Sequence, residues 1–299
     1  MTDAVSKGSP LTAPTATASV ASGPFSAAYT RYALWLLLGL SVVNFIDRSI
    51  VNILAEPIKK ELGLHDWQLG VMTGLGFAVV YTLCGLPIAR LAERRNRSLI
   101  ITASAVVWGG FTFLCGSAQS FAQLLLYRTG VGLGEAGYGP TAVSLISDYV
   151  SPAKRASSLA FYAMGAPIGG LMGLALGGIV ADAYGWRGAF LLVGLPALIL
   201  AALAFFTLRE PRKLLASQAA KNQETKATFG ETLRSLGGKR AYWLVMLGAA
   251  TKTFINLGHA PFVVSFFLRN HGHEISGLAS HIGLLSIGFL GLATGLLNG

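Results

Sequence analysis

Five ionisable residues lie inside long apolar stretches of this sequence: Asp47, Arg48, Arg128, Glu135 and Lys252. A charge in a membrane interior costs about 2.5 to 3.5 kcal/mol on insertion scales, so such residues typically face a cavity or a transport pathway. Carboxylates in that setting can bind and release protons, and arginine or lysine can attract an anion. The alternative is that they form buried ion pairs that only fix helix packing, although buried pairs are a poor source of stability.

The depths of three of these residues follow from their positions along the chain. Asp47 lies seven residues before the expected outer end of a helix at 31–54, and Arg128 lies seven residues after the expected outer start of a helix at 121–148. At 1.5 Å per residue, both lie about 10 Å below the same boundary and can pair if the two helices are neighbours. Glu135 lies seven residues beyond Arg128, on nearly the same helix face and about 10 Å deeper.

This arrangement suggests how proton and substrate binding could be linked. We expect Asp47 and Glu135 to be the proton-coupling residues, and Arg48 and Arg128 to bind an anionic substrate. An anionic headgroup would draw Arg128, assisted by Arg48, away from the carboxylates. Glu135 would then take up a proton more readily, because burial disfavours an unpaired carboxylate.

A polar face is also expected on the helix at 240–268. Lys252, Asn256 and His259 share one face at spacings of four and seven residues, which is typical of a polar cavity lining. Lys252 is too far from either end of the helix to reach water easily. We therefore add these three residues to the expected substrate-binding set.

A second group of charges lies in the run Ala89–Arg97, where Glu93 is interleaved with arginines. An acid among bases at a helix end can form an ion-pair network that latches one conformation, so we expect Glu93, Arg94 and Arg97 to act as a gating loop. The alternative is that these arginines only mark the cytoplasmic side of the membrane.

Membrane helices are expected to position all of these residues. Of the 299 residues, 53% are hydrophobic and 12% charged, whereas about a quarter are charged in soluble domains. About 20 apolar residues span a bilayer. Eight segments qualify, at 31–54, 67–92, 98–119, 121–148, 156–182, 188–208, 240–268 and 275–298. The net charge of +10 falls in short loops between these segments, so membrane topology explains it better than nucleic-acid binding.

Small residues inside the apolar segments are expected to pack rather than react. Cys84 and Cys115 both lie in such segments, and we infer no disulfide from them. Glycine recurs at every fourth position in the segment 156–182, which makes a flat stripe for close helix contact. The stripe consists of Gly165, Gly169, Gly173 and Gly177.

Four regions follow from these segments. Residues 1–30 lack the apolar core of a signal peptide and are expected to form a disordered cytoplasmic tail. Residues 31–208 form an N-terminal six-helix bundle, 209–239 a polar linker, and 240–299 the start of a C-terminal bundle. Because only two helices follow the linker, we expect the chain to be truncated.

The distribution of positive charge predicts the orientation of the chain. Sixteen of the 23 Lys and Arg residues fall on the side of the N-terminus, four fall on the other side, and three lie within spans. Lys and Arg in short loops favour the cytoplasm. We therefore expect a multi-pass protein of the inner membrane with its N-terminus inside.

Four runs resemble motifs of the major facilitator superfamily and, within it, of bacterial Spinster-like transporters. Asn-Phe-Ile-Asp-Arg at 44–48 is similar to the first-helix motif of the family. Leu-Ala-Glu-Arg-Arg-Asn-Arg at 91–97 resembles its loop signature, with Glu for the usual Asp and Asn for the usual Gly. Residues 128–138, from Arg128 to Tyr138, are the most specific match, and Arg-Glu-Pro-Arg at 209–212 resembles the motif that closes the first half.

The resemblance implies an all-α membrane fold of twelve helices in two bundles, of which this chain supplies the first six helices and two of the second half. Substrate would bind near the midplane between the bundles, with Tyr138 joining the substrate-binding set. The family points to an anionic amphiphile such as a lysolipid or a sphingosine-phosphate-like molecule. Together with the proton coupling inferred from the buried charges, this predicts a proton-coupled carrier, which we expect to be a monomer. A proton symporter for sugar acids from the same superfamily is the alternative.

Other classes of protein find less support in the sequence. A membrane enzyme needs a nucleophile with a base, or a metal cluster, and neither pattern is present. The run His271-Gly272-His273-Glu274 has no further ligands near it, so we expect no metal and no cofactor. A channel typically shows a selectivity filter or a ring of pore charges, which is also missing.

Overall fold

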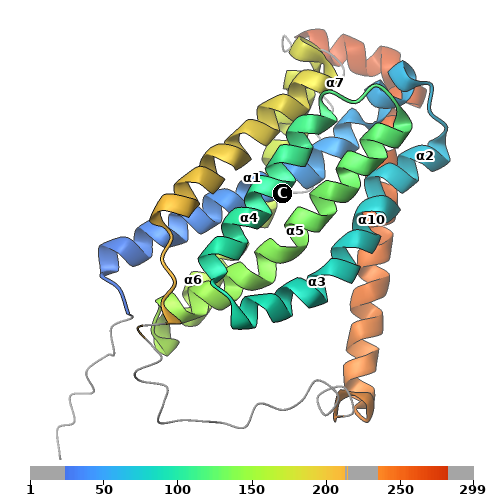
Figure 1. Cartoon of the computed structure of the whole chain (residues 1–299). Coiled ribbons are helices and arrows are strands. Elements are labelled where there is room, and N and C mark those ends of the chain that lie inside the picture. The colour runs from blue at the N-terminus through green and yellow to red at the C-terminus, as the bar shows by residue number, and fades with distance from the viewer. Residues whose placement is uncertain (1–23, 213, 215–234, 282–299) are drawn as a thin grey trace, which may run out of the picture.

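The computed structural model describes residues 24–212, 214 and 235–281 (Figure 1). In this part of the chain the regular secondary structure is entirely helical, as predicted. The elements are α1 (Ala27–Leu62), α2 (Asp66–Gly70), η1 (Val71–Leu75), α3 (Gly76–Arg94), α4 (Arg97–Cys115), α5 (Phe121–Tyr149), α6 (Pro152–Ala163), α7 (Gly165–Thr207) and α10 (Arg240–His281).

Several helices extend further than the predicted spans, whereas α4 ends at Cys115 rather than at 119. α1 continues past residue 54 to Leu62 and ends at Gly63, whose φ of 63° is a left-handed cap that suits glycine. α2, η1 and α3 follow one another without a gap, with η1 as a π-helical turn. The expected break between 182 and 188 is a sharp turn at Gly185, where φ is 71° and the chain reverses within α7. The predicted span 275–298 falls largely outside the described residues.

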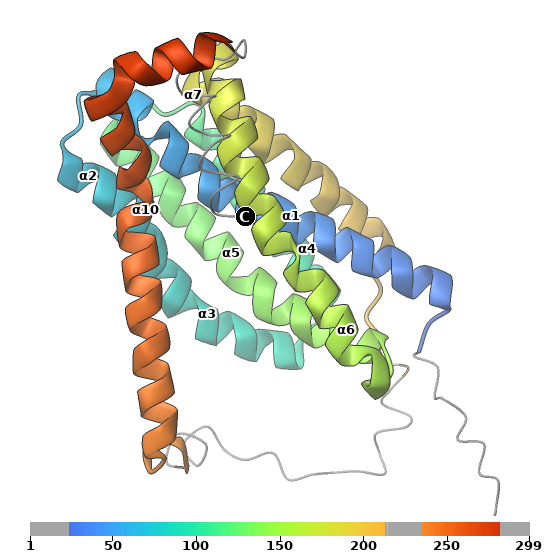
Figure 2. The ribbon, with the colours of Figure 1, turned by 180° about the vertical axis from the view of Figure 1, so that it is seen from behind.

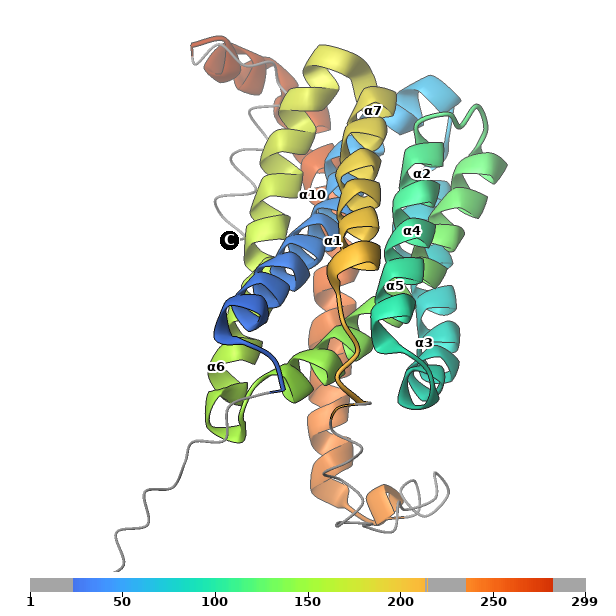
Figure 3. The same ribbon diagram turned by 60° about the vertical axis from the view of Figure 1, so that its left-hand side comes forward.

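Two groups of helices make up the first six spans. α1 packs along both limbs of α7, while α5 packs between α3 and α4 (Figure 3). α4 also packs against α7 and joins the groups. The glycine stripe lies in the contact between α1 and α7: a methyl group on Gly173 would come within 2.8 Å of the Ile46 carbonyl oxygen. The stripe therefore serves close packing, as expected.

Hydropathy marks four stretches of the described residues as long and apolar enough to cross a membrane: Ala27–Leu62, Asp66–Arg94, Arg97–Cys115 and Pro152–Thr207. α5 falls below this measure because glycines and the charges of Arg128 and Glu135 dilute its apolar residues. α10 lies along the edge of the bundle and meets α1, α2 and η1 at one end (Figure 2).

Two apolar clusters fill the bundle, one toward each face. Along α1, Leu40 belongs to one cluster and Ile50 to the other. Along α5, Val131 belongs to the cluster of Leu40, and Leu124 belongs to the cluster of Ile50. The charged residues lie between the clusters. We call the end with the α3–α4 turn and residues 208–212 the linker face, and the end with the α1–α2 turn the far face.

Candidate functional site

A buried ion pair joins α1 to α5. Arg128 Nη1 donates to Asp47 Oδ2 at 3.1 Å, and Thr112 Oγ1 of α4 donates to the other carboxylate oxygen at 2.9 Å. Asp47 is 0% exposed and Arg128 2%. The contact predicted from helix depth is therefore present, and it ties three helices together.

A second ion pair lies beside the first. Arg48 Nε donates to Glu135 Oε2 at 2.5 Å. The Glu135 side chain is 0% exposed, whereas the Arg48 side chain is 30% exposed. The guanidinium of Arg48 lies 4.9 Å from the ring centre of Tyr81 and 5.2 Å from that of Phe77, within the range of cation–π attraction. Sequence reasoning expected Arg48 to assist Arg128, but the structure pairs it with Glu135 instead.

A cavity of 390 Å³ opens at this second pair. Arg48 and Glu135 supply the charged side chains of its lining. The other lining side chains are mostly aromatic or aliphatic: Ser41, Asn44, Phe45, Tyr81, Tyr138, Val143, Leu159 and Tyr162. Arg128 and Asp47 do not line it, so the cation that faces the cavity is Arg48 rather than Arg128.

The other expected substrate-binding residues lie in different surroundings. Tyr138 lines the cavity, but its hydroxyl donates to the Leu37 carbonyl at 2.6 Å. On α10, Lys252 and His259 are exposed and lie outside the cavity, and His259 Nδ1 lies 2.7 Å from the Ile255 carbonyl. The Asn256 side chain lies outside the described residues.

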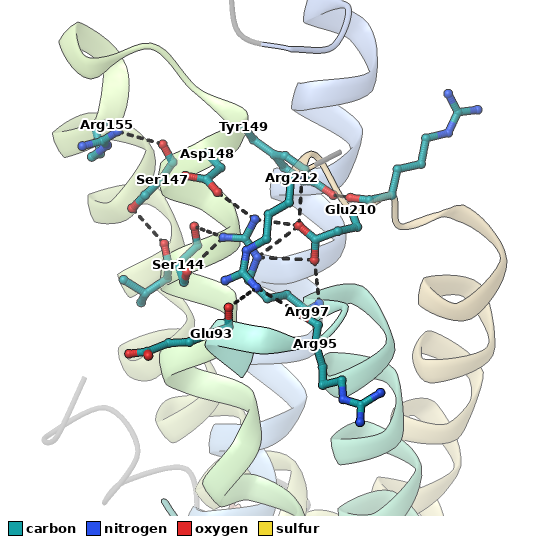
Figure 4. A network of polar contacts seen from close by, with 12 residues as sticks. Glu93, Arg95, Arg97, Ser144, Ser147, Asp148, Tyr149, Arg155, Glu210 and Arg212 are labelled. Carbon is teal, nitrogen blue, oxygen red and sulfur yellow. Dashed lines mark hydrogen bonds and ion pairs between the residues drawn. The ribbon is translucent and has the colours of Figure 1, made fainter. Parts of the chain in front are cut away.

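A polar network lies at the linker face (Figure 4). Arg97, at the start of α4, pairs with Asp148 of α5 at 2.7 Å and with Glu210 after α7 at 2.6 Å. Its backbone N–H also donates to Glu210 at 2.6 Å. Burial alone raises the pKa of Glu210, but the hydrogen bonds from Arg97 outweigh it and hold the pKa below its usual value. The network therefore ties together the ends of three helices of the first half.

The expected gating residues divide between this network and the surface. Arg97 is nearly fully buried in the network. Glu93 contributes its backbone carbonyl, which accepts from Arg212 at 2.8 Å, and Arg94 is exposed. Sequence reasoning missed Asp148 and Glu210 as the acids of the network. The position of Glu210 in the run 209–212, directly after the last helix of the first half, was the available signal.

We expect Glu210→Gln to lower the free energy of unfolding at pH 7 by about 1.5 to 3 kcal/mol, the range for hydrogen bonds to charged groups. A lowered native pKa stabilises the fold above the unfolded value of 4.5 and ceases to do so as pH falls through the native value. Thermal unfolding of wild type should therefore show a loss of stability below about pH 4.5 that the variant lacks. Glu93→Gln is the matched control and should change neither quantity; an equal loss would place its side chain in the network.

A third cluster joins the two halves at the far face. Arg269 of α10 donates to Glu56 of α1 at 2.9 Å and to Asp66 at 2.8 Å, and Lys59 also donates to Asp66 at 2.6 Å. The Glu56 side chain is nearly fully buried. From sequence, Arg269 was only a loop charge. The structure makes it a link between the two halves at the far face.

We expect Arg269→Gln to shift the protein toward states with an open far face, because the contacts of Arg269 with Glu56 and Asp66 stabilise only the state in which that face is closed. Spin labels on cysteines at Lys60 and Glu274, after removal of Cys84 and Cys115, should report longer distances.

The matched control for that measurement is Arg187→Gln. Arg187 lies on the same face but pairs with Glu61 within the first half, from α7 to α1. The variant Arg187→Gln should leave the distances between the spin labels unchanged. An unchanged distance distribution in Arg269→Gln would contradict a role of Arg269 in closing the far face.

Comparison with known proteins is consistent with this geometry. An MFS-type efflux pump of Mycolicibacterium smegmatis is 32% identical over 262 residues, which cover 87% of this chain and 60% of the pump. A hexuronate transporter of Bacillus subtilis is 30% identical over 196 residues, covering 64% of this chain and 45% of that protein.

A solved structure is also similar. It is a crystal structure of a bacterial homologue of the human lysosomal transporter Spinster in an inward-facing, unoccupied conformation, and it superposes with a TM-score of 0.77 at 32% identity. The match covers 91% of this chain and 60% of that one, so the chain spans about three fifths of these relatives or less. The family model of the Major Facilitator Superfamily matches residues 37–299. With its helical fold and its resemblance to Spinster homologues, the chain belongs to the Major Facilitator Superfamily.

Proposed function

We propose that the protein is a proton-coupled secondary transporter that moves an anionic amphiphile by alternating access. The observation that carries the proposal is the Arg48–Glu135 pair at the mouth of a mostly apolar cavity. A single cation beside aromatic and aliphatic side chains suits a molecule with one charged end and an apolar body. The far-face link at Arg269 agrees with alternating access, because a carrier needs contacts that form in one state only.

Arg48 is the shared cation that couples proton and substrate. When an anionic headgroup binds Arg48, Glu135 loses its partner in a buried site and takes up a proton. When the proton leaves, Glu135 competes for Arg48 and the headgroup is released. The two ligands thereby change each other's affinity, which is the thermodynamic condition for coupled transport.

Asp47 and Arg128 have a different part in this proposal from the one expected from sequence. Both are buried and paired with each other behind the cavity. We assign them to positioning: they hold α1 against α5, and so hold Arg48 within reach of Glu135. Asp47 stands as the second carboxylate that could exchange a proton if Arg128 moved.

Transport of a sugar acid is the second candidate, and the hexuronate transporter of Bacillus subtilis supports it. A sugar acid carries many hydroxyl groups and requires matching hydrogen-bonding side chains, because buried polar groups left unpaired cost free energy. Apart from the ion pair and the tyrosines, the lining offers Ser41 and Asn44. This lining favours the amphiphile.

Uptake into proteoliposomes tests the proposal. A pH gradient should drive accumulation of labelled lysophosphatidate but not of labelled glucuronate. Unlabelled lysophosphatidate on the opposite side should accelerate exchange, as for a carrier and unlike a channel. Accumulation of glucuronate alone would replace the first candidate with the second.

The proposed location is the inner membrane, with the N-terminus and the linker face in the cytoplasm, as the distribution of Lys and Arg favours. In a background without Cys84 and Cys115, a cysteine at Arg95 should react with an impermeant thiol reagent only from the cytoplasm. A cysteine at Lys60 should react only from outside. Both positions are exposed at opposite faces, and reversed labelling would invert the orientation.

A further inference from the structure

A second cavity lies on the opposite side of the contact between α1 and α7 from the first. It is a groove of 700 Å³ between α1 and both limbs of α7. Trp35, Val42 and Ile46 of α1 line one side, and Met172 and Leu192 of α7 line the other. The groove lies wholly within segments that are apolar enough to span a membrane, which places it at the depth of the bilayer.

Gly39 adds to the open space of the groove because it has no side chain. Gly39 lies among the lining residues between Trp35 and Val43. The nearest atom to a Cβ placed there would be Leu200 Cδ1 at 3.7 Å, an ordinary contact distance. Gly39 therefore differs from the glycines of the stripe, such as Gly173, where a Cβ would collide with the backbone of α1. Close helix packing does not explain it.

The side of α1 that lines the groove is basic at its linker end and becomes apolar toward the middle of the helix. Arg31, Trp35, Gly39, Val42 and Ile46 follow at spacings of three and four residues, so they share one side of the helix. Arg31 is exposed at the linker end, and Trp35 is 64% exposed one turn further in. Basic and aromatic side chains are favoured at the membrane interface, where lipid headgroups lie, and aliphatic side chains at the depth of the acyl chains.

We propose that this groove binds one anionic phospholipid of the surrounding bilayer, with the headgroup at Arg31 and an acyl chain along Gly39 between α1 and α7. The charge at one end and the apolar lining along the rest match the two parts of that molecule. The site is separate from the Arg48–Glu135 cavity, because it lies on the other side of the packed contact between α1 and α7. Its occupancy does not depend on the transported substrate.

Native mass spectrometry of the purified 299-residue chain, after exposure to phosphatidylglycerol or phosphatidylcholine, tests the proposal. Wild type should retain one lipid through delipidation and prefer phosphatidylglycerol. Gly39→Leu places a side chain in the path of the acyl chain and should lose the retained lipid. The matched control is Gly110→Leu, the same change in the membrane-spanning helix α4, where a Cβ meets no atom within 4 Å. It should retain the lipid.

The headgroup is tested separately. Arg31→Gln should reduce the preference for phosphatidylglycerol about fivefold, as expected for one basic side chain at the membrane surface, while Arg94→Gln, another exposed arginine of the linker face, should not. Retention by Gly39→Leu equal to that of Gly110→Leu would overturn the proposal. So would a change in oligomeric mass in Gly39→Leu without a change in lipid count, because the groove would then be a contact between copies of the chain.

Discussion

Glu135→Gln is expected to abolish pH-driven accumulation of substrate while leaving substrate binding and exchange in place. Glutamine keeps the shape of Glu135 but cannot exchange a proton, and it no longer competes as an anion for Arg48, 2.5 Å away in wild type. A gradient of one pH unit drives about tenfold accumulation for each coupled proton. Proteoliposomes with the variant should show equal concentrations inside and outside at every gradient.

The control for this experiment is Glu61→Gln. Glu61 is a carboxylate of α1 that pairs with Arg187 at the far face, away from the cavity. The variant Glu61→Gln should keep the accumulation of substrate that a pH gradient drives. If Glu135→Gln keeps it as well, with the normal dependence on pH, Glu135 is not the coupling residue and Asp47 becomes the next candidate.

Asp47→Asn is expected to cause the largest loss of stability. The substitution leaves the cation of Arg128 buried and without its partner, and breaking a buried ion pair on one side costs about 3 to 5 kcal/mol. Arg128 is 2% exposed and cannot reach water without moving α5. Thermal and denaturant unfolding in detergent should show the loss, and transport should fall with it because Arg48 is no longer held beside Glu135.

Two further variants separate charge from packing. Thr112→Val removes a single hydrogen bond to Asp47 and should cost less than Asp47→Asn. The double variant Asp47→Leu with Arg128→Met removes both charges and should recover most of the stability, because apolar pairs of similar volume can replace buried ion pairs. A loss of less than about 1 kcal/mol in Asp47→Asn alone would contradict the buried pair.

The sequence by itself determined where the long apolar helices of the first half lie. About 20 apolar residues are required for each span, and this requirement is local, so each predicted span of the first half corresponds to helical segments of the structure, with ends that differ by a few residues. Depth is local as well, since each helical residue rises 1.5 Å. For that reason the pairing of Asp47 with Arg128 could be predicted from counting residues.

Which side chain faces the cavity was decided by the tertiary structure. Asp47 and Arg48 are adjacent in sequence, so they point about 100° apart around α1. One therefore reaches Arg128 inside the bundle and the other reaches Glu135 at the cavity. The rotation of a helix about its axis depends on all of its neighbours, and a stretch that is apolar on every side carries little information about it. Sequence reasoning therefore named the four charges, but it could not tell that Arg48 lines the cavity and Arg128 does not.

Contacts between distant segments were also decided only by the fold. Glu210 lies 113 residues after Arg97, and Arg269 lies 213 residues after Glu56, yet each pair is in direct contact. A charge at a helix end carries no local signal of its partner, because the partner depends on which helix ends meet at that face. Hydropathy places helices in the bilayer, but side-chain packing selects their neighbours. The positions of its apolar helices therefore follow from local composition, whereas its polar networks and grooves arise from helix packing.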